Sequence, residues 1–257
     1  MLADVVATST LTILAYAAVA LWCFLTALAG GVAGLVLGNI RLPALLLVAS
    51  SPAAGAGANI GVSAIAALTA GSTHIRAGRI DWRLVAWMTP PSVAGAVIGG
   101  LAAGALPGDA LLVVIGVALL GFGIDLLRPR RTPTVRRDRV DVRAAAAAGA
   151  AIGLLGGLVG LILGALRMPA LLRLGEPPAQ AVGTNLTVGV AVGIAGVAGH
   201  APGGIDWGLL ALGATASIPG ALLGARLTGR LDERQLLRAV GAILLVAGSA
   251  AIVQGLV

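Results

Sequence analysis

The chain has 257 residues, of which 58% are hydrophobic and only 11% are charged. A soluble domain needs about twice that charged fraction to cover its surface, so the composition excludes an ordinary soluble protein. The formal charge of +7 comes from 17 basic residues, all arginine, and seven of them crowd between residues 128 and 143. Arginine clustered between apolar stretches is typical of cytoplasmic loops of membrane proteins, and we expect no nucleic-acid partner.

Apolar stretches of about 20 residues, long enough to cross a bilayer, recur along almost the whole sequence. The N-terminus lacks a basic segment before its first apolar run, so we expect a retained span and not a cleaved signal. Cys23 is the only cysteine, so no intrachain disulfide or cysteine-based metal site is expected. The sequence therefore predicts an all-α, polytopic integral membrane protein.

The sequence repeats itself after a shift of 126 positions. The repeated positions include the arginine, asparagine and histidine pairs Arg41/Arg167, Asn59/Asn185 and His74/His200, the proline pairs Pro43/Pro169 and Pro52/Pro178, and the glycine pairs Gly30/Gly156, Gly34/Gly160 and Gly38/Gly164. Beyond a one-residue gap, Ile80-Asp81-Trp82 matches Ile205-Asp206-Trp207. Chance matches in an Ala/Gly/Leu-rich chain would not align these rarer residues, so we infer an internal duplication.

Each half is predicted to hold the same elements in the same order. A glycine-rich helix runs into a break at Gly38–Pro43, and a short apolar piece follows and closes at Ser51-Pro52. The expected helices of the first half are near 10–37, 56–73, 82–104 and 110–127, and those of the second near 144–164, 179–199, 207–226 and 235–256. The chain thus divides into a first repeat (1–127), an arginine-rich surface linker (128–143) and a second repeat (144–257), with about eight to ten spans in total.

The arginines discriminate between two topologies. With an even number of crossings per half, the repeats are parallel and the arginines between residues 226 and 238 face outward. With an odd number, the repeats are inverted, and 16 of the 17 arginines lie inside or at the inner boundary, leaving only Arg167 outside. The positive-inside rule favours the inverted arrangement, which is common in proteins that give alternating access to a central site.

The break is the most informative feature of each half. Pro43 and Pro169 cannot lie in an uninterrupted helix, and irregular backbone at membrane depth occurs only where protein or water surrounds it. We expect a short helix to begin at each proline, with Gly38 and Gly164 at the break. Its N-terminal N–H groups would then favour an anion.

Four polar side chains beside the breaks are candidate anion ligands. Arg41 and Arg167 suit bidentate binding of an oxyanion, although they could also reach an interface or bond to backbone carbonyls. Asn59 and Asn185 could line the cavity or cap helix ends, and Thr184 offers a hydroxyl beside Asn185. The pairs together predict an anion site between the two breaks.

Proton coupling has weaker candidates. His74 and His200 lie at span ends, where a boundary role is the alternative, and Glu176 is the acidic residue nearest to a pore. The sequence carries no nucleotide-binding loop, metalloprotease motif, cysteine pair or serine elbow. We therefore expect no enzyme activity, no metal and no cofactor.

The arrangement of a glycine-rich helix, Arg-x-Pro-Ala-Leu-Leu, Pro-x-Gln-Ala-Val-Gly-Thr-Asn, a histidine and Gly-Ile-Asp-Trp resembles the TauE/SafE sulfite-exporter family. The likeness is clearest at Gly156–Trp207 and looser at Gly30–Trp82. It implies a duplicated membrane protein that moves sulfite, sulfonates or small organic acids, with Gly38, Arg41, Pro43, Gly164, Arg167, Pro169, Asn59 and Asn185 along the substrate route. Asn-Ile-Arg-Leu and Ala-Leu-Arg-Met, where many members have more glycine, leave the anion open.

The predicted function is export of a small oxyanion across the inner membrane of a bacterium, by a multi-pass protein that requires only the anion and the lipid bilayer. A homodimer is one option for its assembly. Two alternatives stay open: a proton- or sodium-coupled importer of an organic anion, and a non-transporting subunit that assists a partner enzyme.

Overall fold

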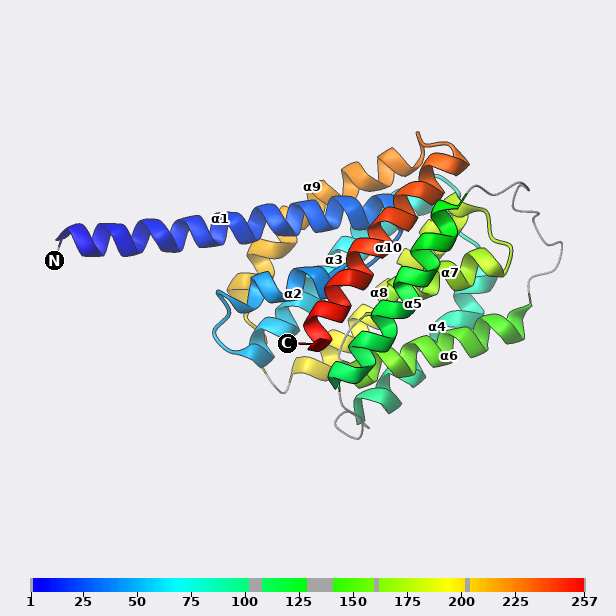
Figure 1. Ribbon diagram of the computed structural model, residues 1–257, viewed down its shortest axis with the longest axis horizontal. Helices are drawn as coiled ribbons and strands as arrows, with labels where there is room; N and C mark the ends of the chain where they lie inside the picture. The colour runs from blue at the N-terminus through cyan, green and yellow to red at the C-terminus, as the bar shows by residue number, and fades with distance from the viewer. Residues whose placement is uncertain (1, 102–107, 129–140, 160–161, 202–203, 257) are drawn as a thin grey trace.

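The computed structural model describes residues 2–101, 108–128, 141–159, 162–201 and 204–256, which form helices joined by short turns, with no strand among them. The ten helices are α1 (Leu2–Ala33), α2 (Gly38–Leu46), α3 (Pro52–Arg76), α4 (Trp82–Leu101), α5 (Gly108–Leu127), α6 (Val142–Val159), α7 (Gly164–Arg173), α8 (Pro178–His200), α9 (Trp207–Thr228) and α10 (Glu233–Leu256) (Figure 1). The all-α prediction is confirmed. Helices α3–α5 and α8–α10 begin and end within a few residues of the predicted spans.

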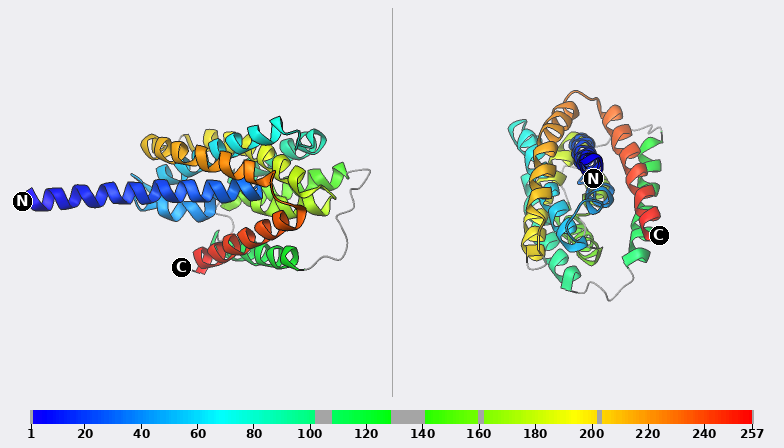
Figure 2. Two further views of the ribbon diagram at one scale, coloured as in Figure 1. Left: turned by 90° about the horizontal axis from the view of Figure 1, so that it is seen from above. Right: turned by 90° about the vertical axis from the view of Figure 1, so that its left-hand side faces the viewer.

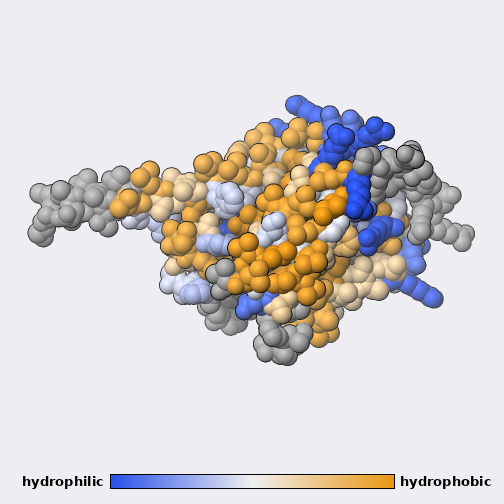
Figure 3. All heavy atoms as spheres, viewed as in Figure 1, coloured by the Kyte–Doolittle hydropathy of each residue, from blue (hydrophilic) through white to orange (hydrophobic). Residues whose placement is uncertain are grey.

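The surface of the bundle is suited to lipid. Five helices, α1, α3, α8, α9 and α10, are long and apolar enough to cross a bilayer. Large apolar side chains face outward, such as Leu47 at 85% and Leu101 at 84% exposure. Hydrophobic residues cover the face formed by α1, α10 and α5, and hydrophilic residues gather where α9 turns into α10 (Figure 3). The protein is an integral membrane protein, as predicted.

The first helix of each half packs against the fourth helix of the other half. A methyl group on Gly220 of α9 would lie 2.4 Å from the Phe24 carbonyl oxygen of α1. At the repeated positions, a methyl group on Gly95 of α4 would lie 2.4 Å from the Ala150 carbonyl oxygen of α6. Because only glycine allows such close backbone approach, the repeated spacing of small residues produces the same helix contact twice.

The corresponding helices α5 and α10 pack antiparallel to each other. Gly116 faces the Gly248 carbonyl, whereas Gly123, further along α5, faces the earlier Gly241 carbonyl of α10. Helices α3 and α8 also pack antiparallel to each other. Figure 2 shows α5 and α10 together on one side of α1, with α9 on the other side. Helices that hold the same place in the two predicted repeats therefore run in opposite directions.

The break in the first half lies earlier than the sequence analysis placed it. Helix α1 ends at Ala33, four residues before the predicted end, because Gly34 adopts a left-handed φ of 68°. The Leu35 N–H donates to the Gly30 carbonyl at 2.9 Å, a Schellman-type closure. A side chain at Gly34 would also collide with Val182 of α8, 2.6 Å away. Conformation and close packing therefore both require glycine there.

The short helices α2 and α7 begin at Gly38 and Gly164, so the prediction that they begin at Pro43 and Pro169 is wrong. Both prolines lie inside the helices. Proline at 43 cannot donate to the Asn39 carbonyl one turn earlier. The side-chain amide of Gln254, on α10, donates to that carbonyl at 3.0 Å instead. A distant helix thus satisfies the backbone group that proline leaves without its usual partner, and a helix beginning before the proline becomes stable.

Arginines from two separate segments lie at one end of the bundle, which we call the arginine end. The Arg79 guanidinium, between α3 and α4, packs on Gly229, between α9 and α10. Arg173, at the end of α7, stacks on Phe122 of α5 with 4.5 Å to the ring centre. Residues 129–140 of the predicted linker lie outside the described residues. The opposite end holds Ser50, whose N–H donates to Asp206 at 3.1 Å.

Candidate functional site

Arg41 is held inside the protein by the helix that follows it. Its side chain, on α2, is 2% exposed. Its Nε donates to Asn59 Oδ1 at 2.9 Å, and its Nη2 donates to the Asn59 carbonyl at 3.1 Å and to the Ser63 hydroxyl. Asn59 and Ser63 are one turn apart on α3 and so face the same way. Three hydrogen bonds therefore fix the guanidinium in one position.

The second half repeats this arrangement with fewer bonds. Arg167, on α7, is 1% exposed, and its Nη1 donates to Asn185 Oδ1 at 3.1 Å. Its Nε has no hydrogen-bond partner. Neither guanidinium reaches an interface, so the alternative in which these arginines extend to the membrane surface is wrong. A bond to a backbone carbonyl, the other alternative, occurs at Arg41 alone among the described contacts.

Both asparagines lie two turns inside their helices, so the alternative in which they cap helix ends is wrong. The N-cap of α3 is Ser51, whose hydroxyl accepts from Ala54 N at 3.2 Å. Asn59 Nδ2 donates to the Gly38 carbonyl at 3.0 Å, and Asn185 Nδ2 donates to the Gly164 carbonyl at 2.8 Å. Each asparagine thus joins the first residue of a short helix to the arginine of that helix.

The two breaks touch each other in the centre of the protein. Asn185 Nδ2 also donates, at 2.6 Å, to the carbonyl of Gly34 in the other half. A methyl group on Gly164 would lie 3.3 Å from the Val36 backbone nitrogen. In each half the arginine, the asparagine and the first residue of the short helix are in contact, and Asn185 connects the second half to Gly34 of the first; a site between the two breaks stays a prediction.

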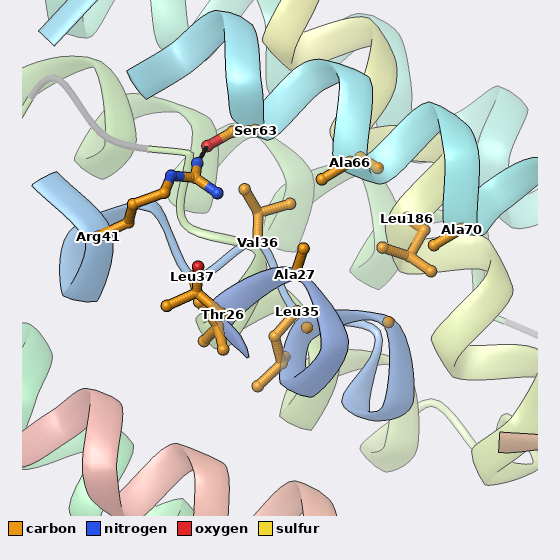
Figure 4. Close-up of a pocket in the computed structure, with 13 residues that line it drawn as sticks. Thr26, Ala27, Leu35, Val36, Leu37, Arg41, Ser63, Ala66, Ala70 and Leu186 are labelled. Carbon is orange, nitrogen blue, oxygen red and sulfur yellow. Dashed lines mark hydrogen bonds between the residues drawn. The ribbon is translucent and has the colours of Figure 1, made fainter. Parts of the chain in front are cut away.

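A small cavity lies beside Arg41 (Figure 4). Its volume is about 10 Å³, which is close to the minimum that one water needs. Its lining combines small residues from α1 and α3 with Val36 and Leu186. One terminal nitrogen of Arg41 points to Ser63 and the other toward Val36 (Figure 4). An oxyanion with several heavy atoms needs more room, so this state is closed around the site.

Thr184 faces away from the arginine site. Its hydroxyl, 0% exposed, accepts from the Asp81 N–H at 3.0 Å. A methyl group on the neighbouring Gly183 would lie 2.0 Å from the Arg79 carbonyl oxygen. This part of the Gly-Thr-Asn motif therefore holds the turn between α3 and α4 against α8, and the binding role expected for Thr184 has no support from its hydrogen bond.

The coupling candidates lie apart from the two breaks. His74 lies in the last turn of α3 and is fully buried, next to the turn at Arg79, and neither ring nitrogen has a hydrogen-bond partner. Glu176, 4% exposed, lies in the turn between α7 and α8. The side chain of His200 lies outside the described part of the structure. Among the described residues, no three acidic, histidine or cysteine side chains come close enough to hold a metal.

Two buried positive charges lie beside the breaks, and the described residues give neither guanidinium a negatively charged hydrogen-bond partner. All hydrogen-bond partners found for Arg41 and Arg167 in the described residues are neutral: Asn59, Ser63 and Asn185. A buried charge without a counter-charge is costly. A bound anion would offset that cost, and the guanidinium groups suit oxyanions of planar or tetrahedral shape.

Ser63 was missed in the sequence analysis. It binds Arg41 but has no counterpart in the second half, where Gly189 occupies the repeated position. A search limited to repeated residues therefore passes over it. Its spacing of one turn after Asn59 is the signal that could have identified it.

Comparison with known proteins agrees with this geometry. No curated protein and no solved structure matches the chain. The chain does match the family described as sulfite exporter TauE/SafE over residues 19–251, nearly its whole length. The duplicated helices, the two broken helices with buried arginines and this match lead to one conclusion: the chain belongs to the TauE/SafE sulfite exporter family of membrane transporters.

Proposed function

We propose that the protein is a non-enzymatic permease that exports a small oxyanion, such as sulfite, a sulfonate or a related organic acid. The anion binds where the two breaks meet, near the first turns of α2 and α7. Arg41 and Arg167 neutralise it, and Asn59 and Asn185 keep both arginines in place. The single observation that carries the proposal is the pair of fully buried guanidiniums whose described partners are all neutral.

Inverted repeats in a bacterial inner membrane are part of the same proposal. The antiparallel contact of α5 with α10, two copies of one element, supports inversion, because parallel repeats would bring matching helices together in the same direction. The arginine end then faces the cytoplasm. The closed cavity beside Arg41 fits one state of an alternating-access cycle.

The membrane potential can drive such export without a coupling ion. With the cell interior negative, 100 mV supplies about 2.3 kcal/mol per charge, which corresponds to roughly a 50-fold gradient at equilibrium. A proton-coupled importer is the second candidate, and the buried, unpartnered His74 is the observation in its favour. The two candidates differ in the gradient that each requires.

The test is flux of labelled sulfite and of a small sulfonate in proteoliposomes, with the voltage set by a potassium gradient. We expect movement that follows the imposed voltage and is abolished by both Arg41→Ala and Arg167→Ala. Arg173→Ala, which removes an exposed arginine at the other end of α7, is the matched control. Anion flux that requires a pH gradient would support the proton-coupled importer and contradict the exporter. Normal flux in both arginine variants would rule out the anion site.

A further inference from the structure

The two arginine sites differ at one repeated position. Asn59 and Asn185 each follow their arginine by 18 residues and bind it. Four residues later, α3 carries Ser63, which binds Arg41, whereas α8 carries Gly189. Because the positions i and i+4 of a helix share a face, a side chain at 189 would approach Arg167 as Ser63 approaches Arg41.

The two guanidiniums also differ in their hydrogen bonds. Arg41 makes three hydrogen bonds in the described structure, and Arg167 makes one. Ser63 binds the Nη2 of Arg41, so glycine at 189 accounts for one of the missing bonds. The Nε of Arg167, whose counterpart in Arg41 donates to Asn59 Oδ1, is also buried without a partner. A charged donor left unsatisfied in the interior is costly, and native proteins keep such a group mainly where a ligand or ion completes it.

Crowding does not explain the glycine at 189. A methyl group there would lie 3.4 Å from Val36 Cγ2 and 4.0 Å from Ala67 Cβ, which are ordinary contacts. At Gly193, one turn later, the same methyl group would come within 2.9 Å of Ala64. Packing therefore requires glycine at 193 but not at 189, where a Cβ makes only ordinary contacts.

The small cavity beside Arg41 is adjacent to Arg167's surroundings through Val36. Val36 lines the cavity beside Arg41, and its Cγ2 would lie 3.6 Å from a methyl group on Gly164 and 3.4 Å from one on Gly189. The same side chain thus borders the cavity and the surroundings of Arg167. A movement of Val36 would join them.

We propose that the oxyanion binds directly to Arg167, whose guanidinium is left open by glycine at position 189, while Ser63 and Asn59 lock Arg41 as a fixed positive charge. This inference rests on the proposed function and deepens it. Although the repeats look symmetric, the protein then has one anion contact and not two equivalent ones.

The test places a hydroxyl group beside Arg167 without removing the arginine. We compare Gly189→Ser with Gly189→Ala, which adds the same carbon but no hydrogen-bond acceptor. Binding of sulfite and of a small sulfonate is measured by calorimetry on purified protein, and flux is measured in proteoliposomes. The melting temperature without anion is a third measurement.

Gly189→Ser is expected to weaken binding by about tenfold or more, because its hydroxyl accepts the Arg167 hydrogen bond that the anion would receive. It should also melt at a higher temperature than Gly189→Ala in the absence of anion. Equal binding and equal melting temperatures of the two variants would overturn the open Arg167 site while leaving the permease intact. A folded wild-type protein that neither binds nor moves an oxyanion would overturn the proposed function itself.

Discussion

Replacement of Asn185 by alanine tests the hydrogen bonds that connect the two halves. The side chain makes three buried hydrogen bonds: Nδ2 donates to Gly164 at 2.8 Å and to Gly34 at 2.6 Å, and Oδ1 accepts from Arg167 at 3.1 Å. A bond to a charged group contributes about 1.5–3 kcal/mol and each neutral one about 0.5–1.5 kcal/mol. Asn185→Ala should therefore lower the free energy of unfolding by about 2.5–6 kcal/mol.

The measurement is the melting temperature of purified protein in detergent, where a loss of about 3 kcal/mol corresponds to roughly 6–12 °C. The matched control is Asn39→Ala on α2, because Asn39 Nδ2 makes one part-buried bond of 3.4 Å, to the Ala247 carbonyl. We expect that control to cost less than about 1 kcal/mol. If both variants melt at the same temperature, the asparagine does not hold the breaks together.

Three further predictions concern other parts of the fold. Gly34→Ala should destabilise the protein more than Gly121→Ala on α5, where a methyl group meets nothing within 4 Å, because Gly34 combines a φ of 68° with a 2.6 Å approach to Val182; equal melting temperatures would refute the requirement for glycine. Hydrogen bonds from the backbone of Leu209 and Ser50 lower the pKa of Asp206, so its contribution is present above the ordinary pKa of about 3.9 and is lost as the pH falls through the lowered value. Asp206→Ala should therefore lower the free energy of unfolding by about 1 kcal/mol at pH 7 and by less in strong acid. A loss of stability that does not depend on pH would contradict this. A membrane-impermeant thiol reagent added outside should label Ser50→Cys but not Arg230→Cys in intact cells, with the buried Cys23 silent; labelling of Arg230→Cys would refute the proposed orientation.

The amino-acid sequence by itself determined the helical membrane fold and most of the helix ends. Those features depend on local properties: long apolar stretches, polar turns, and prolines that begin α3 and α8. The duplication was visible because rare residues recur in register. The same repeats identified Arg41, Arg167, Asn59 and Asn185, and the structure pairs each arginine with one of the asparagines.

Only the tertiary structure decided where each helix breaks and what the site residues contact. The break at Gly34 depends on Val182, and the helix around Pro43 depends on Gln254 in the last helix. Each of these partners is more than 100 positions away, so no local pattern contains it. The difference between Ser63 and Gly189 is visible in the sequence, but only the packing of α2 against α3 shows that Ser63 binds Arg41.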